Sequence, residues 1–106
     1  MVRRFDIFLV NLDPEVSRDA KNTRPCVVVS PDEMNGSLGH VIIAPISSGS
    51  AAYPTRIPVE LLNSKRHIVL DQLQAVDADR LVKKIGELDT AIQKITLSTL
   101  QEFFAE

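Results

Sequence analysis

The spacing of apolar residues changes once along this chain, near residue 89, and this change constrains the fold most. Before it, short β-branched and apolar runs are separated by proline-, glycine- and asparagine-containing turns, which is typical of strands. After it, apolar residues recur at helical intervals, at Ile92, Ile95, Leu100, Phe103 and Phe104. Strands first and a helix last favour an α+β or small-barrel fold over repeated βαβ units. We therefore expect residues 1–106 to form a single, mainly β domain with a C-terminal helix.

The segments with strand character lie in the first part of the chain. They are 6–12, 26–30 (entered through Arg24-Pro25), 40–46, 55–61 and 68–70, the last continuing into the alternating segment 72–76. Pro58 cannot donate a hydrogen bond to a neighbouring strand, so segment 55–61 is expected at a sheet edge.

The connections between these segments carry further signals. Residues 15–23 form a polar loop that is long for a compact domain and is therefore a candidate for function. Residues 63–66 are expected to be a turn, and Asp77 is expected to cap a short helical turn. Asp89 or Thr90 is expected to cap the C-terminal helix.

Charge and cysteine content exclude several classes of function. The net charge of −2 argues against non-specific coating of nucleic acid, but not against an enzyme that holds a few nucleotides in a cleft. One cysteine and two histidines do not make a zinc site within the chain, so no metal or other cofactor is expected. The lone Cys26 favours a reducing, cytoplasmic location. No apolar run of ~18 residues and no signal-peptide pattern is present, which predicts a soluble protein. Glycine-rich phosphate-binding motifs are also absent.

Three places in the chain are candidates for chemistry. Arg24 stands where the polar loop enters an apolar strand, and an unpaired buried guanidinium there would be costly, so it either pairs with a carboxylate or binds an anion in a cleft. Ser47 and Ser48 follow a strand end, where their hydroxyls face solvent or a ligand, or form a turn. Asp71 lies in a segment rich in Val and Leu. Since aspartate is a poor strand former, it needs a buried hydrogen bond or a functional role.

These three places fall in motif blocks that resemble the MazF/PemK toxins from residue 6 to about residue 104. The most specific block is TRPCVVVSP at 23–31, in which Arg-Pro precedes a β-branched run. The others are DIFLVNLDP at 6–14, IIAPISS at 42–48 and IVLDQL at 68–73. Their order and spacing match those of the family, and together they are a strong signal.

The resemblance implies an SH3-like β-barrel, a homodimer and a toxin of a type II toxin–antitoxin system. It implies metal-independent, sequence-selective cleavage of single-stranded RNA, including mRNA, by attack of the ribose 2′-hydroxyl on the adjacent phosphate. The products would be a 2′,3′-cyclic phosphate and a 5′-hydroxyl, and DNA would not react because it lacks the 2′-hydroxyl. The cognate antitoxin would carry an acidic disordered tail that competes with RNA for the same basic cleft.

Carried over to this chain, the family's catalytic residues are Arg24, Ser47 and, at the acidic position used by some members, Asp71. A fixed guanidinium can pair bidentately with phosphate oxygens, and a serine hydroxyl can donate to the same phosphate. Asp71 could accept the 2′-hydroxyl proton, although a carboxylate with an ordinary pKa of ~4 is a weak base. The residues expected to bind RNA are Arg18, Lys21, Ser48, Arg56 and Gln72.

Two features depart from the family pattern, and two other functions stay open. Phe5 stands where many members carry glycine, and the loop at 15–23 lacks the usual glycine and nearby glutamate. The loop reads RNA in the family, so its departure bears on specificity. One alternative is a gyrase-poisoning toxin of the CcdB type on a related fold, whose penultimate tryptophan is absent here. The other is a catalytically silent interaction module. His40 and His67 are expected to be surface residues.

Overall fold

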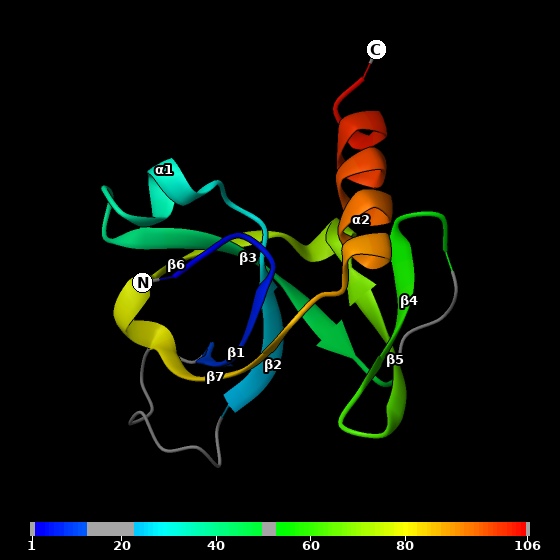
Figure 1. Ribbon diagram of the computed structural model, residues 1–106, viewed down its shortest axis with the longest axis horizontal. Helices are drawn as coiled ribbons and strands as arrows, with labels where there is room; N and C mark the ends of the chain where they lie inside the picture. Colours follow the sequence, from blue (N-terminus) through cyan, green and yellow to red (C-terminus); the bar gives the residue numbers. More distant parts are fainter. Residues whose placement is uncertain (1, 13–22, 50–52, 106) are drawn as a thin grey trace.

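The computed structural model describes residues 2–12, 23–49 and 53–105, called the described residues below. Their strands form one curled antiparallel sheet with a helix packed beside it (Figure 1). The strands are β1 (Asp6–Asn11), β2 (Thr23–Val28), β3 (His40–Ser47), β4 (Arg56–Leu61), β5 (Ser64–Val69), β6 (Gln74–Asp77) and β7 (Leu81–Glu87). The helices are α1 (Asp32–Asn35) and α2 (Thr90–Phe103), with 3-10 turns η2 (Leu70–Gln72) and η3 (Ala78–Arg80). The predicted fold, mainly β with a C-terminal helix, is confirmed.

Strand β3 is the centre of the sheet because it pairs with three strands, β2, β5 and β6. The strand order is β4-β5-β3-β2-β1-β7, and β6 also pairs with β3. One edge of β3 pairs with β2. The other edge pairs first with β6, beside residues 40–43, and then with β5, beside Ile46 and Ser47. The end of β3 is therefore bordered by β2 on one side and β5 on the other.

Apolar side chains of the sheet pack on both of its faces. One cluster lies inside the curl and contains Val10, Cys26, Val28, Val41 and Ile43, with Val76 and Leu81 packed against it. The other contains Ile7, Val27, Ala44, Ile46, Ile57 and Ile68, and α2 packs against it through Ile92, Leu97 and Leu100. Residues 26–30 are all buried, as predicted, although β2 ends at Val28 and the last two of these residues lie beyond the strand.

Some boundaries differ from those expected from the sequence. Segment 68–76 is not one strand: η2 interrupts it, so the prediction that Asp71 lies within a strand is wrong. The turn at 63–66 is shorter than expected. Leu62 and Asn63, with φ of 54° and 60°, make a two-residue hairpin turn between β4 and β5. Residues 64–66 consequently belong to β5.

The edge strand and the helix cap agree with the sequence. Strand β4, which contains Pro58, ends the strand order, as predicted. Asp89 caps α2, and its side chain accepts a hydrogen bond from the Ile92 backbone N–H at 2.9 Å. Asp77 precedes η3 but makes no side-chain cap hydrogen bond. Among the described residues, no helix is long and apolar enough to cross a membrane.

Phe5 adopts a backbone conformation that favours glycine. Its φ is 75°, in the left-handed region, where a bulky residue is strained by about 1–3 kcal/mol. The ring is only 6% exposed and joins the cluster that packs against α2. Burying a phenylalanine side chain contributes about 1.5–3 kcal/mol, which is enough to offset strain of this size. The departure from glycine at this position is therefore compatible with the fold.

Candidate functional site

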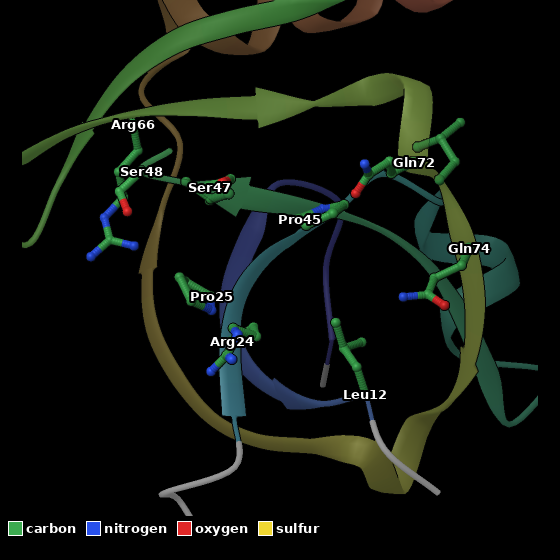
Figure 2. A pocket seen from close by; sticks show the side chains of 11 residues that line it. Leu12, Arg24, Pro25, Pro45, Ser47, Ser48, Arg66, Gln72 and Gln74 are labelled. Atoms are coloured by element: carbon green, nitrogen blue, oxygen red, sulfur yellow. The ribbon is translucent and has the colours of Figure 1, made fainter. Parts of the chain in front are cut away.

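A cavity of about 550 Å³ opens where β2 begins and β3 ends (Figure 2). It brings together residues from five separate stretches of the chain. They are Leu12, Arg24, Pro25, Pro45, Ile46, Ser47, Ser48, Arg66, Gln72, Leu73 and Gln74. The polar members are guanidinium, hydroxyl and amide groups, and no carboxylate or imidazole lines the cavity among the described residues. Its chemistry therefore suits an anionic ligand with hydrogen-bonding edges.

Arg24 is placed at the cavity by the register between β2 and β3. This ladder pairs Cys26 with Pro45, and continuing it by two residues sets Arg24 opposite Ser47. Arg24 is exposed, and its guanidinium donates a long hydrogen bond, 3.4 Å, to the backbone carbonyl of Thr23. No carboxylate pairs with it among the described residues. Of the two alternatives raised for Arg24, an ion pair or an anion site, the surroundings favour the anion site.

Ser47 and Ser48 lie where the β3 ladder ends. The Ser47 hydroxyl oxygen accepts a hydrogen bond of 3.3 Å from the Gly49 backbone N–H, which leaves its own proton for another acceptor. Ser48 is exposed and lines the same cavity. The Ser47 hydroxyl can therefore stabilise the turn and donate to a ligand in the cavity at the same time.

The opposite wall comes from the segment that joins η2 to β6. Gln72 and Gln74 both line the cavity, and Figure 2 shows their amide groups directed into it. Pro25 and Pro45 add apolar surface to the lining of the cavity. The sequence had predicted Gln72 as a binding residue but not Gln74, although the alternation of the segment places both on one face.

Asp71 and Arg56 do not line the cavity, although both were expected at the site. The Arg56 guanidinium donates from Nε to Oδ1 and from Nη2 to Oδ2 of Asp71, each at 3.1 Å. Thr55 donates a third hydrogen bond to Asp71, and the Tyr53 ring lies 4.7 Å from the guanidinium carbon. The hydrogen bonds from Arg56 lower the pKa of Asp71, which makes this carboxylate a still weaker base. The reason sought for an aspartate in this segment is therefore a structural ion pair.

Arg66 is a further cavity residue that was not expected at the site from the sequence. It had been assigned to a turn, but the hairpin turn ends at Asn63 and Arg66 lies in β5. The period-2 spacing from buried Ile68 was the signal that could have placed Arg66 on a defined face. Figure 2 shows its guanidinium at the same side of the opening as Arg24.

The remaining predicted residues divide between surface, core and positions outside the structure. Arg18 and Lys21 lie outside the described residues. His40 and His67 are partly exposed, and neither lines this cavity. Cys26 is buried, which raises the pKa of its thiol to about 12. Within ranges 2–12, 23–49 and 53–105, no group of three or more His, Cys, Asp or Glu side chains is arranged to hold a metal ion.

Comparison with known proteins gives one family. Residues 3–104 match the model of the PemK-like, MazF-like toxin of type II toxin-antitoxin systems. The chain is 30% identical to Endoribonuclease MazF9 of Mycobacterium tuberculosis, over 86% of each chain. It is 32% identical to Endoribonuclease MazF of Staphylococcus epidermidis, over 80% of this chain and 76% of the relative.

Solved structures show the same fold at lower identity. The M. tuberculosis toxin MazF-mt6 superposes with a TM-score of 0.77 at 20% identity, covering 93% of this chain and 95% of that one. A MazE-MazF structure from Deinococcus radiodurans gives a TM-score of 0.79 at 17% identity, covering 98% and 95%. An endoribonuclease in complex with its cognate antitoxin, from a mycobacterial species, gives 0.78 at 16% identity, covering 96% and 93%.

Proposed function

This chain belongs to the PemK-like, MazF-like toxin family, and on this premise we propose that it is a sequence-selective endoribonuclease of a type II toxin–antitoxin system. The substrate is single-stranded RNA, including mRNA, and the reaction needs no metal. The single observation that carries the proposal is the pairing of an exposed guanidinium with a hydroxyl inside one cavity. Arg24 and Ser47 line the same cavity, and no carboxylate among the described residues lines it with them.

Arg24 supplies positive charge where the reaction builds negative charge. In the reaction the ribose 2′-oxygen bonds to phosphorus and the bond from phosphorus to the 5′-oxygen breaks, leaving a 2′,3′-cyclic phosphate and a 5′-hydroxyl. Charge on the phosphate oxygens rises before that bond breaks. A guanidinium fork already fixed on a strand stabilises this charge through two parallel hydrogen bonds.

Ser47 orients the phosphate that Arg24 holds. Its oxygen already accepts from Gly49, so its proton is available to a phosphate oxygen. No carboxylate or imidazole among the described residues lines the cavity, so the 2′-hydroxyl proton passes to solvent water and the 5′-oxygen takes a proton from it. The mechanism therefore depends on charge stabilisation and orientation more than on a side-chain base.

The opposite wall of the cavity suits unpaired bases. The Gln72 and Gln74 amides each offer donors and acceptors, which match the hydrogen-bonding edges of bases that are not paired in a duplex. Pro25 and Pro45 supply flat apolar surface beside them. Ser48 adds a further hydroxyl at the rim. We include Arg18 and Lys21, which the sequence places beside this strand, as further RNA-binding residues.

Two protein partners belong to the proposal. The first is a cognate antitoxin whose acidic disordered tail binds the cavity through Arg24 and so excludes RNA. An antitoxin complex among the similar structures supports such a partner. The second is another copy of this chain, in a homodimer. The protein is expected to act in the cytoplasm, where mRNA is available.

The test is incubation of purified protein with single-stranded RNA in excess EDTA, with an Arg24→Ala variant as control. We expect cleavage to persist in EDTA, the fragments to carry 2′,3′-cyclic phosphate and 5′-hydroxyl ends, and the variant to leave the RNA intact. An all-deoxy strand of the same sequence should also stay intact. Loss of cleavage in EDTA, or equal cleavage by the variant, would contradict the proposal.

A further inference from the structure

Arg66 presents a second guanidinium to the cavity, and its surroundings resemble those of a ligand-binding group. Its Nε atom is buried and has no hydrogen-bond partner in the part of the chain that the structure describes. No ion pair among the described residues involves it. A buried, charged donor without a partner costs free energy, so its position needs a compensating interaction.

The position of Arg66 in β5 explains why its stem is buried while its head reaches the cavity. Arg66 pairs with Val59 of β4, and it lies two residues before Ile68, on the same face of the strand. Ile68 is fully buried and Val59 packs against the same core cluster. The aliphatic stem of Arg66 therefore extends the core, and the guanidinium emerges at its end, at the cavity.

The two arginines approach the cavity from opposite sides of β3. Continuing the β2–β3 register sets Arg24 opposite Ser47, and continuing the β3–β5 register sets Arg66 opposite Ser48. Neighbouring strands lie about 4.8 Å apart, so the backbones of β2 and β5 are separated by about 10 Å. Figure 2 shows both side chains at the same side of the opening, with Arg66 beside Ser48 and Arg24 beside Pro25. This separation favours two anionic groups over one group shared by both arginines.

We propose that Arg66, with Ser48, binds a backbone phosphate next to the scissile phosphate held by Arg24 and Ser47. This inference rests on the proposed function and adds a second phosphate subsite to it. A phosphate in this subsite would accept from the otherwise unpartnered Nε and from the outer nitrogens of the guanidinium.

The contact predicts a binding effect that is separable from catalysis. A flanking phosphate is bound equally in the ground and transition states, so its loss raises KM and leaves kcat nearly unchanged. Losing a charged hydrogen-bonded contact corresponds to a rise in KM of about tenfold. On a single strand, each phosphate contact contributes about 0.7 to the slope of log Kd against log salt concentration.

The experiment compares wild type, Arg66→Gln, Arg66→Lys and Lys65→Gln. Lys65 is the matched control because it is exposed, lies next to Arg66 in β5 and does not line the cavity that contains Arg24 and Ser47. RNA cleavage gives kcat and KM, and binding of an all-deoxy single strand gives the salt slope. Circular dichroism melting checks that each variant is folded.

We expect Arg66→Gln to raise KM about tenfold, to keep kcat within about twofold and to lower the salt slope by about 0.7. Arg66→Lys should restore the slope, because it restores the charge, while Lys65→Gln should match wild type in KM. A folded Arg66→Gln with wild-type KM and slope, or with a large loss of kcat instead, would overturn the proposal. If wild type leaves RNA intact, the proposed endoribonuclease function fails. In that case, the salt dependence of all-deoxy strand binding still decides whether Arg66 binds a phosphate. If wild type does not bind the all-deoxy strand detectably, the proposed phosphate subsite at Arg66 is overturned as well.

Discussion

Arg24 and Arg56 border the same sheet, yet their surroundings are opposite. Arg56 has a side chain that is only 16% exposed and lies 3.1 Å from the Asp71 carboxylate, over the Tyr53 ring. Arg24 is exposed at a cavity rim and has no carboxylate partner among the described residues. The comparison shows which cation is used by the fold and which is available to a ligand. From the sequence, Arg24 was expected to be catalytic through the family resemblance, and Arg56 was expected to bind RNA.

Arg24→Lys should have a larger effect than the variants of Ser47 and Asp71. Lysine keeps the positive charge but replaces the planar fork with a point charge, so the two parallel hydrogen bonds to the phosphate are lost. We expect kcat to fall about 100-fold, with the melting temperature unchanged. Single-turnover cleavage of RNA measures this. A lysine variant with wild-type kcat would mean that charge alone is sufficient and that the geometry of Arg24 is unimportant.

Ser47→Ala should have the next largest effect. Removing the hydroxyl deletes one hydrogen bond to the charged phosphate, and we expect kcat to fall about tenfold. Ser47→Thr, which keeps the hydroxyl, is the matched control and should remain within about threefold of wild type. A Ser47→Ala variant that melted at a lower temperature but kept the wild-type kcat would contradict a catalytic role for Ser47. The hydroxyl would then act only in the turn, through its hydrogen bond from Gly49.

Asp71→Asn tests whether the ion pair between Arg56 and Asp71 is structural and not catalytic. It removes the ion pair with Arg56, and we expect the melting temperature to fall by a few degrees at most, because the pair is partly exposed. Cleavage by the folded variant should stay within about twofold of wild type. Loss of cleavage at unchanged melting temperature would return Asp71 to the catalytic role that the sequence resemblance had implied.

The ion pair should also give a signature in acid. The hydrogen bonds from Arg56 lower the pKa of Asp71 in the folded protein, so the unfolded chain takes up a proton first as the pH falls. The stabilisation by the pair is present above the unfolded pKa of about 4 and is lost as the pH falls through the lower folded pKa. Melting temperatures of wild type and Asp71→Asn should therefore converge between about pH 5 and pH 2. If the difference between the two melting temperatures stayed constant over this pH range, protonation of Asp71 would not be coupled to unfolding.

The sequence was sufficient for elements that depend on local patterns. The capped helix α2, the Pro58 edge strand and the strand buried on both faces follow from spacing, capping and proline chemistry. Arg24 and Ser47 lie near strand ends in a recognisable motif, and their catalytic roles stay predictions. Their meeting in one cavity required the register of β2 and β3 as well.

The remaining features depend on long-range pairing, which the sequence pattern does not contain. Asp71 and Arg56 are 15 positions apart and meet because η2 interrupts the expected strand. Arg66 reaches the cavity because a two-residue turn extends β5 through it. In both cases a local departure from the expected secondary structure decides whether a charged residue forms a structural ion pair or lines the cavity.

The most direct test of the comparison is the initial rate of RNA cleavage in EDTA by Arg24→Gln and Arg56→Gln, which remove the same charge from the two regions. We predict that Arg24→Gln lowers the rate about 100- to 1,000-fold at an unchanged melting temperature. Folded Arg56→Gln should stay within about threefold of wild type while melting at a lower temperature. The account would be contradicted if Arg24→Gln cleaved RNA at the wild-type rate, or if folded Arg56→Gln lost as much activity as Arg24→Gln.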